Sequence, residues 1–112
     1  FETAAQLEQM LEEGYLDLGE EELGRAVMHF SAALEAAPDH AEAVIGLVLA
    51  HCWQERPREA RAVLERHRGL FERAPELAWV EAELLHEEGR APEARAAEQR
   101  LTEMNSALAL FL

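Results

Sequence analysis

The 112-residue sequence predicts an all-α domain made of three stacked helix–turn–helix units. Three observations lead to this prediction. Ala26, Ala60 and Ala94 recur at intervals of 34 residues, the length of one helix–turn–helix repeat. Alanine, leucine, glutamate and arginine favour helix throughout the chain, and apolar residues return every three or four positions. Glycines and prolines fall where turns between such helices are needed.

These glycines and prolines divide the chain into six expected helices. They cover residues 4–18, 22–37, 40–54, 58–73, 76–88 and 91–104. The turns inside the pairs are expected at Gly19, Gly24, Pro57, Gly89 and Pro92. Pro38 and Pro75 separate one pair from the next, because proline cannot continue a helix. Asp39 is expected to cap the helix that begins near Ala41, and Pro75 suits a first helical turn.

The segment "GRAVMHFSAALEAAPDHAEA" resembles the second helix and the junction of a tetratricopeptide repeat. Ala26, Phe30, Ala33 and Pro38 stand at the small, aromatic, small and proline positions of that family. The resemblance covers residues 7–101. It implies a single domain over residues 1–112, folded as a short right-handed superhelical solenoid. Repeats are expected at about 7–40, 41–74 and 75–104, with a C-terminal capping helix or tail over 105–112.

The second and third repeats depart from the family pattern. His67 stands where a small residue is usual, and Pro75 arrives three residues late. Glu98 occupies the aromatic position of the third repeat. The degenerate motif therefore predicts the fold much more specifically than it predicts the function.

In tetratricopeptide arrays, the first helix of each pair lines a concave groove that binds another protein. The resemblance implies that the groove of this chain is lined by Leu11, Tyr15, Leu18, Ile45, Leu49, Cys52, Trp53, Trp79, Glu83 and His86. Its acidic edges are expected at Glu8, Glu42, Glu76 and Glu87. A surface that is apolar and aromatic in the middle suits an amphipathic helix or an extended apolar segment of another protein.

Some groove positions admit a second interpretation. Ile45 and Leu49 suit the hydrophobic core as well as the groove. Trp53 lies at a helix end beside a turn, where large aromatic residues are often half exposed and enriched at interfaces. Family members that clamp free C-terminal carboxylates use lysine and asparagine, whereas this chain has no lysine and its one asparagine, Asn105, lies outside the repeats. A different kind of partner is therefore expected.

The net charge of −13 is unevenly distributed. Residues 1–24 contain eight acids and no base, whereas residues 51–75 contain six arginines and four glutamates. An acidic chain disfavours nucleic acid as a partner. The longest apolar run, "AVIGLVLA", is too short to insert into a membrane. A lone cysteine cannot form an internal disulfide, which favours a reducing cytoplasm.

The sequence predicts no catalytic centre, cofactor or metal. Cys52 and His51 are adjacent on a helix, so their side chains point about 100° apart. His86 lacks the second histidine that a helical zinc protease site needs four residues on. Glu83 and His86 form one carboxylate–histidine pair, but a di-metal bundle needs two such pairs and further carboxylates. A solvated groove edge is the favoured interpretation of this pair, and a metal-dependent enzyme is the remote alternative.

The expected function is a non-enzymatic adaptor or chaperone that holds a partner helix or apolar segment in the groove. The chain is also similar to the small cytoplasmic chaperones of bacterial type III secretion, above all to those of the needle subunit. This similarity rests on its length and acidity and on "AEAVIGLVLAHCWQ", "APELAWVEAELLHEEG" and "SALALFL". The alternative is a self-associating scaffold, a homodimer through the C-terminal tail, or a fragment of a longer solenoid. The tail either caps the fold or docks on another chain.

Overall fold

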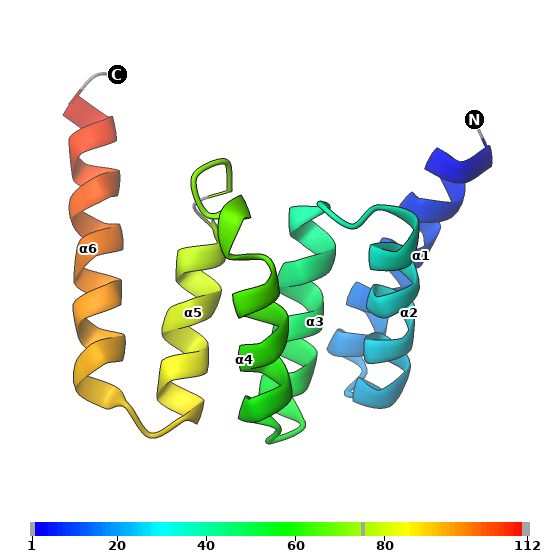
Figure 1. The fold of residues 1–112 in the computed structure, drawn as a ribbon, viewed down its shortest axis with the longest axis horizontal. Coiled ribbons are helices and arrows are strands. Elements are labelled where there is room, and N and C mark those ends of the chain that lie inside the picture. The colour runs from blue at the N-terminus through cyan, green and yellow to red at the C-terminus, as the bar shows by residue number, and fades with distance from the viewer. Residues whose placement is uncertain (1, 75, 111–112) are drawn as a thin grey trace.

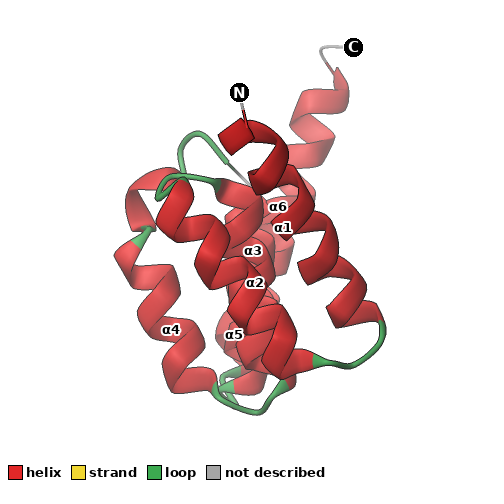
Figure 2. Ribbon diagram, turned by 90° about the vertical axis from the view of Figure 1, so that its right-hand side faces the viewer, coloured by secondary structure: helices red, strands yellow, loops and turns green. Residues whose placement is uncertain are grey.

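The computed structural model describes residues 2–74 and 76–110, with side chains for 5–74, 76–100 and 102–103. Its helices are α1 (Glu2–Gly19), α2 (Leu23–Ala36), α3 (Ala41–Trp53), α4 (Pro57–Arg66), α5 (Glu76–Glu87) and α6 (Ala91–Leu110), with a 3₁₀ turn, η1 (Arg68–Leu70). The described residues form no strand, which confirms the all-α fold class (Figures 1 and 2). None of the helices in these ranges is long and apolar enough to cross a bilayer.

The helices pack in consecutive pairs, α1 with α2, α3 with α4 and α5 with α6. The pairs follow one another in a row, with α1 and α6 at opposite ends (Figure 1). Because α3 contacts both α1 and α5, the first helices of the three pairs form one layer, called here the first-helix layer. This arrangement confirms the predicted stack of helix–turn–helix units.

The three turns inside the pairs share one backbone geometry. Glu21, Glu55 and Gly89 have positive φ angles of 61°, 61° and 75° and lie 34 residues apart. In each turn the amide of the next residue donates to the carbonyl five positions back, at 2.8, 2.9 and 2.8 Å for Glu22–Asp17, Arg56–His51 and Arg90–Leu85. This is the Schellman ending of a helix, which favours glycine at the positive-φ position. The 34-residue repeat is therefore present in the backbone conformation even at Glu21 and Glu55, where the residue is not glycine.

Phe30 is the centre of the first repeat. Its side chain is fully buried, and the edge of its ring meets Tyr15 with the centroids 5.0 Å apart. A Cβ atom added at Gly14 would lie 2.8 Å from the ring, and one at Gly46 would lie closer still. The two glycines therefore allow α1 and α3 to approach the ring, although glycine inside a helix costs about 0.5–1 kcal/mol relative to alanine.

The alanines of the 34-residue period occupy the close contacts that the sequence predicts. Ala26, Ala60 and Ala94 are all fully buried. One core cluster extends from α1 to α5, and a second, smaller one joins α5 to α6 through Ala82, Leu85, Ala94 and Ala97. Among the described side chains, the last helix is thus attached mainly through small residues, which permit close packing but bury little apolar area.

The expected helix over 58–73 is wrong in its second half. α4 ends at Arg66, and η1 follows. His67 leaves the helical conformation, and its Nδ1–H donates to the carbonyl of Val63, 2.8 Å away. The tighter turn places Leu70 in the core and brings Arg68 over the ring of Phe71, 4.5 Å from its centroid.

Two further expectations need correction. Asp39 does not cap α3, because the amide of His40 closes a turn onto Ala37 at 3.1 Å and makes His40 the N-cap residue. The segment 105–110 continues α6 instead of forming a separate tail, since no glycine or proline ends the helix after Pro92. The expected first-turn position of Pro75, residues 111–112 and the side chains of 104–110 lie outside the described residues.

Candidate functional site

Large apolar side chains are exposed mainly on the first-helix layer. Tyr15 (38% exposed), Leu16 (64%), Trp53 (48%) and Trp79 (64%) lie on α1, α3 and α5, and only Met28 (60%), of those in the described part, lies on α2. Both tryptophans of the chain are among them. Tryptophan and tyrosine are enriched in the parts of interfaces that contribute most to binding.

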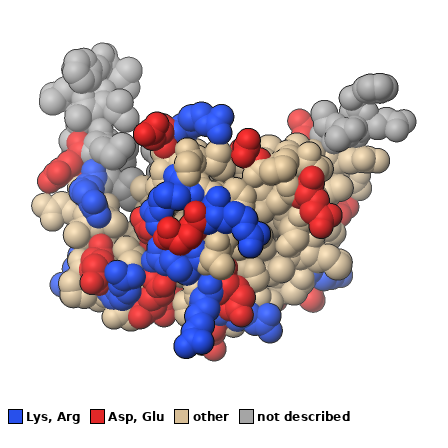
Figure 3. Space-filling view, in the orientation of Figure 1, with Lys and Arg blue, Asp and Glu red and all other residues tan. Residues whose placement is uncertain are grey.

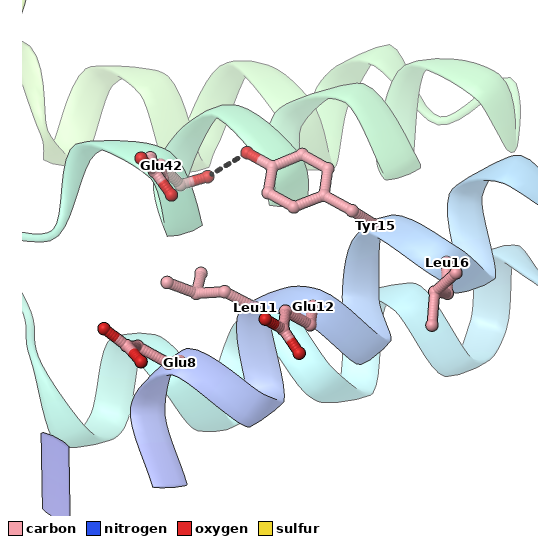
Figure 4. Close-up of a pocket in the computed structure, with 6 residues that line it drawn as sticks. All are labelled: Glu8, Leu11, Glu12, Tyr15, Leu16 and Glu42. Atoms are coloured by element: carbon pink, nitrogen blue, oxygen red, sulfur yellow. Dashed lines mark hydrogen bonds between the residues drawn. The ribbon is translucent and has the colours of Figure 1, made fainter. Parts of the chain in front are cut away.

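A groove of about 680 Å³ opens between α1 and the start of α3 (Figure 4). We call it the α1–α3 groove, and it is lined by Glu8, Leu11, Glu12, Tyr15, Leu16 and Glu42. Its volume is within the range of pockets that bind small ligands or side chains of a partner. Leu11 points into the space between the two helices, while the carboxylates of Glu8 and Glu12 lie at its edge (Figure 4).

Tyr15 joins the two walls of the α1–α3 groove. Its hydroxyl donates to the main-chain carbonyl of Glu42, 2.9 Å away on α3 (Figure 4). Burial and the nearby Glu42 carboxylate raise the pKa of the Tyr15 hydroxyl above its ordinary value, which keeps it protonated as a donor. The two walls of the groove, α1 and α3, are therefore tied to each other by this hydrogen bond.

Five of the predicted groove residues have exposed side chains, namely Tyr15, Trp53, Trp79, Glu83 and His86. His86 does not form a metal pair with Glu83: its Nε2 lies 2.8 Å from Glu98 on α6. Among the described residues no group of three histidine, cysteine or acidic side chains is arranged to hold a metal ion. Glu83 and His86 thus lie at a solvated edge of the layer.

The other predicted groove residues are less accessible. Leu11 is buried beneath the α1–α3 groove, and Ile45 and Leu49 are partly buried. Leu18 and Cys52 (6% and 1% exposed) belong to the core cluster and, unlike Leu11, do not line the α1–α3 groove, so their assignment to an accessible surface is wrong. At both positions the neighbouring helices cover the side chain completely enough to exclude a partner.

The environment of Cys52 also excludes it as a nucleophile. Burial, with the carboxylates of Glu87 and Glu83 as smaller contributions, raises the pKa of the thiol to about 12. The reactive thiolate is therefore scarce at neutral pH. His51, its neighbour in sequence, makes no hydrogen bond through its buried Nδ1 within the described structure.

Glu12 and Leu16 of the α1–α3 groove are absent from the predicted set. Their signal is present in the sequence, because Glu8, Glu12 and Leu16 follow one another at intervals of four and therefore share one side of α1. The family register emphasised other positions of α1, and Glu12 and Leu16 lie on an adjacent side that is exposed in the structure.

A cluster of ion pairs joins α4 to α5. Arg61 donates to both carboxylate oxygens of Glu88, at 3.1 and 2.5 Å, and to Glu81 at 3.0 Å. Arg68 reaches the same Glu81 oxygen at 2.8 Å and pairs with Glu65. Basic and acidic side chains gather over this part of the molecule (Figure 3). The arginines that the sequence concentrates in 51–75 are therefore partly neutralised by α5.

Comparison with known proteins agrees with this geometry. The model of the Tetratricopeptide repeat family matches residues 17–78, which is more than half of the chain and includes α2, α3 and α4. No curated protein and no solved structure matches the sequence. Repeats of this family generally mediate interactions between proteins and are typically non-enzymatic. The chain is a member of the tetratricopeptide repeat family.

Proposed function

We propose that the protein is an adaptor or chaperone that holds an amphipathic helix or an extended apolar segment of another protein on its first-helix layer. The observation that supports this most directly is the exposure of both tryptophans, Trp53 on α3 and Trp79 on α5. Exposed tryptophan in a folded chain is unfavourable in water and is typical of binding surfaces. No catalytic constellation among the described residues competes with this interpretation.

The proposed binding surface keeps most of the residues that the sequence suggested. It consists of Leu11, Tyr15, Ile45, Leu49, Trp53, Trp79, Glu83 and His86, with Glu12 and Leu16 added and Leu18 and Cys52 removed. Apolar residues of a bound helix recur every three or four positions, so one side of such a helix can contact the aromatic residues in succession.

A narrower version of the proposal is a cytoplasmic chaperone for a small secreted subunit, of the kind that serves type III secretion. Its support is the short acidic chain, the three repeats and the aromatic surface. Such a chaperone would cover the apolar side of a client helix and so prevent its self-association.

The alternative is a scaffold that dimerises through its C-terminal end. It is supported by the length of α6, which has 20 residues against 12 for α5 and extends past its neighbour (Figure 1). Light scattering over a range of protein concentrations separates the two proposals. A dimer that persists at low micromolar concentration favours the scaffold, and a monomer leaves the first-helix layer free for a client.

The adaptor proposal is tested by selecting binders from a displayed library of 16-residue peptides. We expect peptides with apolar residues at three- and four-residue spacing, whose Kd weakens about thirtyfold with Trp79→Ala, the ratio that corresponds to about 2 kcal/mol. Met28→Ala is the matched control, because Met28 is equally exposed but lies on α2. The proposal is refuted if the selected peptides bind Trp53→Ala and Trp79→Ala as tightly as the wild type.

A further inference from the structure

The first helices of the three pairs differ from the second helices in the charged residues that they contain. The first helices α1, α3 and α5 contain five, one and four carboxylates and no arginine. The chain has ten arginines and no lysine, and the arginines lie in α2, α4, η1, α6 and the connecting segments. The layer that exposes the aromatic residues is therefore the layer without arginine, and its basic side chains are the histidines His51 and His86.

Some of these carboxylates have a basic partner within the molecule. On α1, Asp17 is buried and lies 2.6 Å from His29 Nδ1, while Glu13 lies 3.0 Å from the other nitrogen of the same ring. On α5, Glu81 pairs with Arg61 and Arg68. All of these partners belong to the second helix of a pair or to η1. The paired carboxylates therefore face the second helices.

The remaining carboxylates of the layer whose side chains are described are exposed. They form no ion pair with a basic side chain of the described part of the molecule, and they are Glu8, Glu12, Glu42, Glu76, Glu83 and Glu87. Three of them line the α1–α3 groove. The layer thus exposes aromatic residues and unpaired negative charges together.

The acidic groups lie near both ends of α3. Glu42 stands in its first turn, where it lines the α1–α3 groove. Glu83 and Glu87 of α5 lie close enough to Cys52 to raise the pKa of its thiol, and Trp53 is the next residue. A segment that covers Tyr15, beside the start of α3, and Trp53, at its end, therefore passes carboxylates at the beginning and at the end of its path.

We infer that the segment bound by this layer is basic, with lysine or arginine beside its apolar residues. The inference rests on the proposed function and adds the charge of the partner. An acidic segment would bring like charges together, and a neutral one would cover carboxylates without supplying a counter-charge. The α6 of a second copy is a poorer match, because it contains three glutamates and only two arginines.

The peptide selection described above tests this inference through the charge of its products. We expect the tryptophan-dependent peptides to contain an excess of Lys and Arg over Asp and Glu. In the tightest of them, replacing the basic residues by Gln weakens binding, and replacing them by Glu weakens it further. Raising NaCl from about 50 to 500 mM weakens the basic peptide several-fold and leaves the Gln version nearly unchanged.

Variants of the protein locate the charges that matter. Glu83→Gln with Glu87→Gln, and separately Glu8→Gln with Glu12→Gln, should each weaken the basic peptide by about two- to fivefold per carboxylate and leave the Gln version unaffected. Glu35→Gln is the matched control, because Glu35 is exposed on α2. Circular dichroism verifies that each variant is folded.

The outcomes separate the two proposals. Neutral or acidic peptides that bind in a Trp79-dependent manner overturn the inference and leave the proposed function intact. Equal affinities of the basic peptide and its Gln version also overturn the inference and leave the proposed function intact. If no selected peptide depends on Trp53 or Trp79, the proposed function fails and the inference fails with it. Binding by a second copy, detected as a dimer that Arg95→Glu or Arg100→Glu in α6 dissociates, also overturns the inference.

Discussion

Replacing Gly46 with alanine tests how α1 and α3 are held around Phe30. The added methyl group would lie closer than 2.8 Å to the ring, and the ring also lies against Gly14 of α1, where an added Cβ atom would be 2.8 Å from it. Overpacking of this kind costs about 1–3 kcal/mol. Alanine is a better helix former than glycine, and this difference stabilises the folded protein by about 1 kcal/mol. We therefore expect a net loss of up to about 2 kcal/mol, or up to roughly 8 °C in Tm.

The sign of the Gly46→Ala effect should reverse when the ring is removed. In a Phe30→Leu background the overlap is absent, so only the helix propensity remains and Gly46→Ala should stabilise by a few tenths to about 1 kcal/mol. Gly24→Ala is the control, because nothing lies within 4 Å of a Cβ atom there. Urea and thermal unfolding followed by circular dichroism give the four free energies of the cycle. If Gly46→Ala stabilises the protein that retains Phe30, the packing argument is wrong.

Three more predictions follow from single sites. Glu55→Gly should raise the free energy of unfolding by about 1 kcal/mol in urea titrations, since its positive φ suits glycine; an unchanged midpoint would contradict the turn geometry. Cys52 should react with a thiol reagent at pH 8 only as fast as the protein opens, and reaction within seconds without denaturant would show that it is accessible. Burial opposes ionisation of Glu81, but hydrogen bonds from Arg68 and Arg61 lower its pKa below 4.5. The contribution of Glu81 to stability is therefore present above that pH and is lost as the pH falls through the lower folded-state pKa. Acid titration of Glu81→Gln should show a shallower loss of stability in that range, and a slope equal to that of the wild type would refute the assignment.

The repeat pattern predicted the fold well because its signals are local. The 34-residue spacing of Ala26, Ala60 and Ala94 anticipated three buried contacts, and all three are fully buried. Helix-favouring composition and the placement of Gly and Pro located most helix ends within two residues. These features depend on backbone propensity and on the period of one helix, so neighbours in the chain are sufficient to define them.

Sequence patterns failed where the backbone conformation of a turn or a single side-chain contact decides the outcome. The positive-φ position of the turns is glycine only at Gly89, so the sequence does not mark Glu21 or Glu55 as equivalent. The end of α4 depends on His67, whose ring bonds to a carbonyl of the preceding turn, and on the burial of Leu70. Neither contact follows from helix propensity, although Gly69 is a poor helix former and is a local signal that the helix weakens after Arg66.

The candidate site, like the fold, could be predicted from the sequence only in part. The sequence by itself determined that the chain is a tetratricopeptide-type stack, that Trp53 and Trp79 lie on first helices, and that α1, α3 and α5 contain acids but no arginine or lysine. Only the tertiary structure decided that Trp53 is exposed whereas Cys52, one residue earlier, is buried. Adjacent helical residues point about 100° apart, and which of the two directions meets a neighbouring helix depends on how one helix pair packs against the next.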